Sequence, residues 1–353
     1  MTIIDWLVLR RFAFRIAITV TVFLALFALV GSLDTPRIKM LSNFGGPLLA
    51  AAGIAISAVR LSIGVLPFTA LLGTIAAVLD LQSRRELTII LSTGHSIWNV
   101  VRAPVLVMIL FTALMSIGGE TLIILANRAM PGYSGATTRS QTWLEQSGKD
   151  GRYILRAAAV TANPPAIYDA TIFLTDTPSR DRIEAEEIDL MAGHWRIKAG
   201  TRYTLDAAPT PLVDFDLATT TTVGDLRLIA SGARDLTLPE LLQTQMSALS
   251  DSGYRSVTST SLLKSFSLPF MVAGTMLIGI AVAGRYRRRM QYANTILFGI
   301  VGGFVIYVLN EMAVRAGNAE VLPPLVAAAG PAFVAVLVGL TTLLYSQDGT
   351  MRR

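Results

Sequence analysis

Six long apolar runs constrain this chain more than any other feature of its sequence. A helix that crosses a bilayer needs about 20 mostly apolar residues, because the hydrocarbon layer is about 30 Å thick and each residue rises about 1.5 Å. The runs are 16–33, 61–79, 97–119, 265–283, 295–310 and 321–344. Charged residues make up 15% of the chain, below the roughly 25% typical of soluble domains. We therefore expect an α-helical membrane protein with six transmembrane helices, three before and three after a polar insert.

The distribution of positive charge orients these spans. A cytosolic N-terminus and six crossings put most arginines inside, as the positive-inside rule requires. The inside group is Arg10, Arg11, Arg15, Arg84, Arg85, Arg102, Arg285, Arg287, Arg288, Arg289, Arg352 and Arg353. The short outside loops receive only Arg37, Lys39, Arg60 and Arg315. Segment 40–59 is also apolar, but a crossing there would divide the inside group, so we expect it to be an external approach to a long, tilted second helix.

Between residues 130 and 258 the pattern changes to short segments rich in β-forming residues, separated by turn residues. Trp195 and Ile197 alternate with Arg196 and Lys198, which indicates a strand with one buried face. The predicted strands are 153–160, 166–175, 187–191, 194–199 and 226–230, and the predicted turns are 148–151, 163–165, 176–179 and 208–211. Such spacing favours a sandwich or an all-β jellyroll-like domain, which this topology makes periplasmic.

The pattern becomes helical again before the fourth span. Thr237 is a candidate N-cap, Pro239 suits the first turn, and Glu240 places an acid there. We expect this helix to connect the insert to the second group of spans.

No constellation in the sequence indicates catalysis. The chain lacks a glycine-rich phosphate loop, a nucleophile elbow and an H-E-x-x-H zinc motif, and it contains no cysteine. Its two histidines, His95 and His194, fall on opposite sides of the membrane and cannot share a metal. We therefore expect a non-catalytic protein without a metal or cofactor. The formal charge of +6 is explained by the arginines beside the spans, so nucleic acid is not an expected partner.

A short cytosolic segment at 86–92 is helical in pattern and apolar on one side. Leu87, Ile90 and Leu91 make up that side, and Glu86 stands beside two arginines. Such a helix can lie across the membrane face and dock into a partner. The alternative is an ordinary solvated turn with positive-inside arginines.

Two cations follow the first apolar run. Arg37 and Lys39 can meet the phosphates of an anionic lipid, because charge-assisted contacts are strong where water is partly excluded. The alternative is interfacial snorkelling, which requires no ligand.

Four segments together resemble the LptF/LptG family, the permease subunits of the lipopolysaccharide export ABC transporter. They are LPFTALLG at 66–73, RRELTIILSTGHSIW at 84–98, GGFVIYVLNEM at 302–312 and VLPPLVAAAGPAF at 321–333. The second and fifth spans look more like LptG. The resemblance implies three divisions: 1–129 with a coupling helix near 82–96, a β-jellyroll at 130–258, and 259–353.

The resemblance also implies partners and site residues. Two paralogous permeases would pair in the inner membrane of a Gram-negative bacterium, on a dimeric cytoplasmic ATPase. The ATPase-coupling residues would be Arg84, Arg85, Glu86, Leu87, Ile90, Gly94 and His95. Lipopolysaccharide would enter between the first and fifth spans, with contacts from Phe23, Phe27, Arg37, Lys39 and Ile306, and would pass through the jellyroll to a single-span periplasmic bridge protein. Some members carry a lysine in the last turn of the first span and paired lysines after it, whereas this chain has Gly31 and then Arg37 and Lys39. Its headgroup contacts are therefore expected to be weaker or differently placed.

Two other functions compete with export. A secondary transporter would require polar residues at the membrane midplane and broken helices, of which the spans show few. A non-transporting scaffold or receptor would use the insert to bind a protein.

Overall fold

The fold is described from a computed structural model, which places residues 3–92, 96–130, 142–148, 151–175, 181–204, 207–246, 252–284 and 292–348. The chain forms two compact units. The helical unit comprises Met1–Ala126 and Leu263–Arg353, and the β unit comprises Asn127–Leu262. The predicted insert, 130–258, falls within the β unit.

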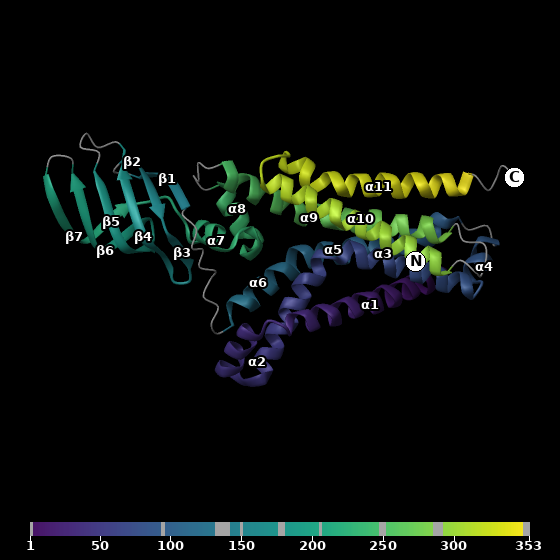
Figure 1. The fold of residues 1–353 in the computed structure, drawn as a ribbon. Helices are drawn as coiled ribbons and strands as arrows, with labels where there is room; N and C mark the ends of the chain where they lie inside the picture. Colours follow the sequence, from purple (N-terminus) through teal and green to yellow (C-terminus); the bar gives the residue numbers. More distant parts are fainter. Residues whose placement is uncertain are drawn as a thin grey trace. The chain divides into compact units, whose positions relative to one another are not determined.

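Long helices build the helical unit (Figure 1). They are α1 (Ile3–Gly31), α2 (Thr35–Gly64), α3 (Leu66–Ser83), α4 (Glu86–Ser92), α5 (Ile97–Leu114), the π-helical turn η1 (Met115–Gly119), α6 (Glu120–Arg128), α9 (Ser252–Gly284), α10 (Tyr292–Asn318) and α11 (Pro324–Asp348). Helices α6 and α9 each continue into the β unit. Within the described ranges, seven stretches are long and apolar enough to cross a membrane: α1, α2, α3, the run through α5 and α6, α9, α10 and α11.

Segment 40–59 belongs to a separate helix, α2, and this corrects the expectation of one long second helix. Non-helical backbone at Gly45 and Gly46 bends α2 near its start. Val65 then breaks the helix, and Pro67 lies in the first turn of α3, where its missing N–H has no helical partner to lose. By length and composition α2 is itself a candidate span.

Helix α3 forms the centre of the helical unit. A Cβ on Gly73 would lie 2.7 Å from Cα of Ile16, so α1 and α3 are in backbone contact there. On another side, a Cβ on Gly303 of α10 would lie 2.7 Å from the ring of Phe68. Small residues permit such close approach between helices in a membrane, where dispersion contacts replace the hydrophobic effect. Helices α1 and α10 therefore both pack on α3.

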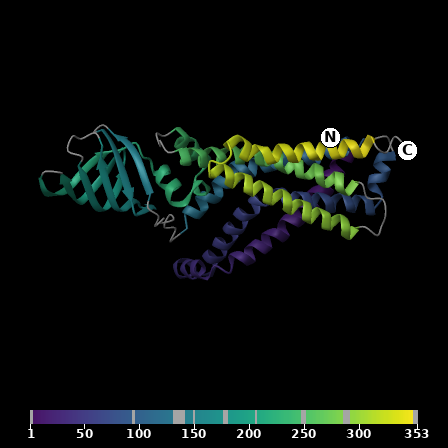
Figure 2. The same cartoon turned by 45° about the horizontal axis from the view of Figure 1, so that its top comes forward.

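The β unit contains one antiparallel sheet (Figures 1 and 2). Its strands are β1 (Thr142–Gly148), β2 (Gly151–Ala157), β3 (Ala159–Ala162), β4 (Pro165–Leu174), β5 (Arg182–Met191), β6 (His194–Thr204) and β7 (Ala207–Ala218). They pair in the order β1-β2-β4-β5-β6-β7, and β3 pairs with β4. Apart from β3, strands that follow one another in the chain are thus neighbours in the sheet. This is a meander, and the Greek-key crossovers of the expected jellyroll do not occur among the described strands.

One face of the sheet forms the core of the β unit. Trp195 and Ile197 are completely buried on it, whereas Lys198 is exposed, which confirms the alternation predicted for this strand. Leu155 and Ile183 are buried on the same face, and Leu226 of α7 (Val223–Ser231) packs onto them. Helix α7 lies beside β3 (Figure 1).

Two predictions in the β unit are wrong. Segment 226–230, predicted to be a strand, is part of α7, because Thr222 and Asp225 form a capping box that starts a helix. Segment 208–211, predicted to be a turn, lies inside β7, where Pro209 and Pro211 are tolerated because β7 is an edge strand. The predicted turn at 176–179 lies outside the described residues.

Candidate functional site

The first candidate site surrounds α4, which occupies the segment where the sequence predicts a short helix. Figures 1 and 2 place α4 at the end of the helical unit where α1 begins and α11 ends. The turn before α4 is tight, and Arg85 has a φ of 61°. This conformation is uncommon for a residue with a side chain and marks a specific turn.

Five charged residues, which we term the charge cluster, join α4 to α1 and α3. Arg15 Nη2 of α1 donates a 2.6 Å hydrogen bond to Asp80 Oδ1 of α3. Arg11 Nη2, one turn earlier, donates a 3.2 Å hydrogen bond to Glu86 Oε1 of α4. Arg11 Nη1 also lies 3.8 Å from Asp80 Oδ2, and Arg84 Nε lies 3.6 Å from Asp80 Oδ1. The cluster therefore ties α1, α3 and α4 of one chain together.

The packing of α4 differs from the expected docking geometry. Leu87 and Ile90 are 7% and 8% exposed and pack into the helical unit's own core with Val100 and Val101. Their side of the helix is thus covered by this chain. Ile89, on the other side, is 61% exposed.

The remaining predicted coupling residues divide into three groups. Glu86 is half-buried and faces α1, and its second oxygen, Oε2, is buried without a hydrogen-bond partner in the described part of the chain. Arg84 and Arg85 are exposed beside it. Gly94 and His95 lie outside the described residues, as do the arginines at 285–289 and 352–353.

Three of the predicted lipid-contact residues lie around the junction of α1, α3 and α10. The ring of Phe23 packs edge-on against Phe68 of α3 at 5.5 Å and lies 6.2 Å from the ring of Phe27. Ile306 of α10 is partly buried against the core. Phe68 also contacts α10 at Gly303, so it connects the two helices that carry the predicted contacts.

The two outer cations differ in their surroundings. Arg37 Nη1 donates a 3.1 Å hydrogen bond to Ser57 Oγ, which lies beyond the bend of the same helix, α2. Lys39 is exposed. Arg37 is thus held by the fold, whereas Lys39 is turned outward.

Helices α1 and α10 expose more apolar surface than the other spans. Only 6% of the apolar stretch of α1 and 11% of that of α10 are buried within the chain, against 67% for α3 and 72% for α9. Side chains such as Leu26 and Phe304 are more than half exposed. In a membrane this surface meets lipid or another apolar helix.

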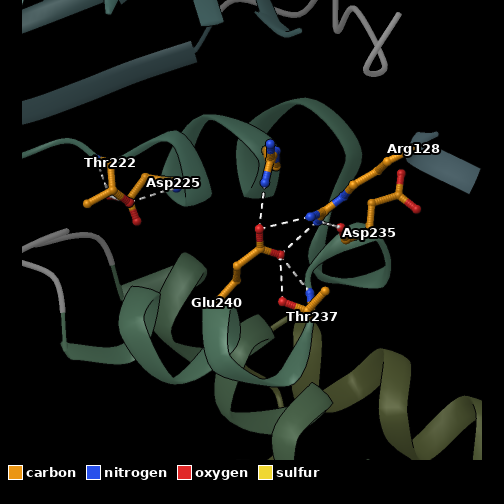
Figure 3. Close-up of polar contacts among 7 residues, drawn as sticks. Arg128, Thr222, Asp225, Asp235, Thr237 and Glu240 are labelled. Atoms are coloured by element: carbon orange, nitrogen blue, oxygen red, sulfur yellow. Dashed lines mark hydrogen bonds and ion pairs between the residues drawn. The ribbon is translucent and has the colours of Figure 1, made fainter. Parts of the chain in front are cut away.

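A second polar centre lies in the β unit, around Glu240 on α8 (Leu238–Met246) (Figure 3). Arg128 donates hydrogen bonds to both carboxylate oxygens, at 2.9 and 2.7 Å, and another to the carbonyl of Asp235. Arg227 adds a 2.5 Å hydrogen bond, and the amide and hydroxyl of Thr237 donate at 2.8 and 2.9 Å. Glu240 thus joins the end of α6 to α7 and α8.

These donors control the ionisation of Glu240. Burial of the carboxyl alone raises its pKa, but the hydrogen bonds from Arg128 and Thr237 and the charge of Arg128 outweigh burial and lower the pKa to about 2. Glu240 is therefore a carboxylate at neutral pH. Thr237 precedes α8 and Glu240 lies in its first turn, as predicted.

Three arginines of the two centres are not predicted as contact residues from the sequence. Arg11 and Arg15 serve there only as topology signals, and Arg128 is not singled out. A signal was available, because Arg11 and Arg15 are one helical turn apart, as are Asp80 and Arg84. Neither centre resembles a metal site, and no group of three metal-ligating side chains occurs where the chain is described.

The sequence matches the family model of the lipopolysaccharide export system permease LptF/LptG over residues 6–345, nearly the whole chain. The chain belongs to the LptF/LptG family. No individual curated protein matches it. As an LptF/LptG permease, it is a multi-pass protein of the bacterial inner membrane and a component of lipopolysaccharide transport, not a catalytic enzyme.

Proposed function

We propose that this permease is one half of a transporter that extracts lipopolysaccharide from the inner membrane and delivers it to a periplasmic bridge protein. It pairs with a paralogous permease, itself being the LptG-like partner, and a separate dimeric ATPase supplies the energy. The observation that carries the proposal is the position of α4, which the charge cluster fixes to α1 at a basic end of the helical unit. A motor that moved α4 would therefore act on the spans directly.

The same ion pairs favour six crossings. Because Arg11 near the start of α1 contacts Glu86, an even number of crossings separates them. Helix α1 supplies one crossing, and α2 and α3 together supply the other. The arginines at this end make it cytosolic. The run through α5 and α6 then crosses once more, so the β unit is periplasmic.

We propose that lipopolysaccharide enters along α1 and α10, which form the lateral gates. The apolar surfaces of these helices suit acyl chains, and Phe23, Phe27 and Ile306 lie on the two helices. Keeping each CH₂ group out of water contributes about 0.8 kcal/mol, so a continuous apolar path matters for lipid transfer. Lys39 is exposed and can meet phosphate groups, whereas Arg37 is held by Ser57.

The ATPase contact is assigned to the outward side of the α4 region. Ile89, Arg84 and Arg85 are exposed there. Leu87 and Ile90 support α4 from within, so we assign them to holding the helix in place rather than to the partner contact.

The function is tested by reconstituting the permease with its partner subunits in vesicles that contain lipopolysaccharide. We expect ATP-dependent release of lipopolysaccharide to an acceptor, and a loss of at least tenfold in Ile89→Asp, which places a charge in the ATPase contact. Lys198→Ala, an exposed change in the β unit, is the matched control. Release without ATP, or none in the complete wild-type complex, would contradict the proposal.

Topology and substrate are tested separately. The chain has no cysteine, so single cysteines at Lys198 and Ser92 report the two sides. With only the outer membrane permeabilised, we expect Lys198→Cys to be labelled and Ser92→Cys to be protected. A photoreactive residue at Phe27 should yield lipopolysaccharide adducts, whereas protein-only adducts would favour a scaffold.

A further inference from the structure

Helix α1 contacts α3 at several levels of the membrane unit, and one of them combines an ion pair with backbone contact. Arg15 and Ile16 are adjacent on α1, and both are held by α3: Arg15 by its 2.6 Å hydrogen bond to Asp80, and Ile16 by backbone contact at Gly73. Both side chains of the ion pair are partly shielded, and Asp80 is only 10% exposed. This contact ties α1 to α3 one helical turn beyond Arg11.

Arg11 and Phe27 lie on opposite sides of this contact along α1. Arg11 lies four to five residues before it, at about 7 Å, because a helix rises about 1.5 Å per residue. Phe27 lies 11 residues after Ile16, at about 16 Å by the same rise. Helix α1 is continuous over Ile3–Gly31 and contains no proline, so it can move as one body. A displacement of α1 at Arg11 is therefore passed along the helix to Phe27.

The N-terminal part of α1 is connected to α4 by a contact that can change. Arg11 is shared between Glu86 at 3.2 Å and Asp80 at 3.8 Å, and neither contact is bidentate. Glu86 Oε2 is buried and has no hydrogen-bond partner where the chain is described. If α4 moved toward Arg11 or away from it, the Arg11–Glu86 contact would strengthen or weaken relative to the Arg11–Asp80 contact.

We propose that the Arg11–Glu86 ion pair transmits displacement of α4 to α1 and so opens the path along Phe23 and Phe27. This inference rests on the proposed function and deepens it, because it names Arg11 as the residue that couples the ATPase contact to the lipid-facing helix. Arg11 is a positioning residue and touches neither ATP nor lipid. Glu86 forms its ion pair with Arg11 of the same chain.

The test measures the coupling ratio, which is the amount of lipopolysaccharide released per ATP hydrolysed by the reconstituted complex. In Arg11→Gln we expect ATP hydrolysis to continue and the ratio to fall about tenfold, the effect of losing one charge-assisted interaction. Arg10→Gln is the matched control, since Arg10 is exposed on the same helix and outside the charge cluster. Arg11→Lys retains the charge and should restore most of the ratio.

Two further outcomes decide the inference. The double variant Arg11→Gln/Glu86→Gln should be no worse than the poorer single variant, because both changes break the same pair. Spin labels at Leu26→Cys and Val301→Cys should show a nucleotide-dependent distance change that Arg11→Gln abolishes. A normal coupling ratio in Arg11→Gln, or additive losses in the double variant, would overturn it. If the wild-type complex itself released no lipopolysaccharide with ATP, the proposed function would fail instead.

Discussion

Replacing Glu240 with glutamine should loosen the polar centre that joins α6, α7 and α8. The carboxylate receives hydrogen bonds from Arg128, Arg227 and Thr237, and its pKa is lowered from 4.5 to about 2. A shift of about 2.5 pKa units corresponds to about 3 kcal/mol, because one unit is about 1.4 kcal/mol. Glutamine keeps the shape but removes the charge, so Arg128, only 15% exposed, would lose its counter-ion. We expect the local opening free energy to fall by about 2 to 3 kcal/mol at neutral pH.

Hydrogen–deuterium exchange of the α7 and α8 amides in the full-length permease measures this opening free energy. Glu184→Gln is the matched control, because Glu184 also pairs with an arginine, at 3.1 Å, but both partners are more than two-fifths exposed. Exposed pairs contribute less than about 1 kcal/mol, so the control should change little. If the amides of Glu240→Gln exchanged no faster than those of Glu184→Gln, the assignment of a strong ion pair would be refuted.

The sign of the pH dependence follows from the same shift. The pKa is lower in the folded protein, so the stabilisation is complete above the unfolded pKa of about 4.5 and is lost as pH falls toward about 2. In the wild-type protein, α7 and α8 should therefore open more readily as the pH falls across that interval. In Glu240→Gln this component should be missing.

Four further substitutions test the packing and the helix cap. Gly73→Ala should lower the thermal midpoint of the purified permease, because the added methyl would lie 2.7 Å from Ile16 Cα, whereas Gly302→Ala, with nothing within 4 Å, should leave the midpoint unchanged or raise it. Trp195→Ala should destabilise the β unit by about 3 to 5 kcal/mol, since the ring is completely buried, and near-ultraviolet circular dichroism would detect the loss. Thr222→Ala should cost about 1 kcal/mol through the lost cap of α7 and should speed exchange of its first-turn amides.

The elements that are predicted correctly from the sequence are those set by one dominant physical requirement. Hydrocarbon length identified the apolar helices, and the alternation at Trp195 and Ile197 identified the buried face of β6. The wrongly predicted segments are those where two physical requirements compete. Segment 226–230 is apolar apart from Arg227, yet the capping box of Thr222 and Asp225 directly before it starts a helix. Pro209 and Pro211 usually mark a turn, but an edge strand does not need their N–H groups.

The α4 region shows what a sequence pattern leaves open. Leu87 and Ile90 correctly indicate that one side of this short helix is apolar. They do not indicate which surface covers that side, because a partner's surface and the chain's own core would both require apolar side chains there. The ion pairs of Arg11 and Arg15 depend on how α1, α3 and α4 meet, and these elements are separated by 65 and 75 residues at the contacts.

The charge cluster also bears on how the chain enters the membrane. Three guanidinium groups, those of Arg11, Arg15 and Arg84, meet the two carboxylates of Asp80 and Glu86, so the folded cluster keeps a surplus of one positive charge. Acidic residues count little when a nascent helix chooses its direction of insertion. The arginines can therefore orient the first spans during synthesis and later form the ion pairs that join α1, α3 and α4. The acidic residues that pair with them do not interfere with the first role.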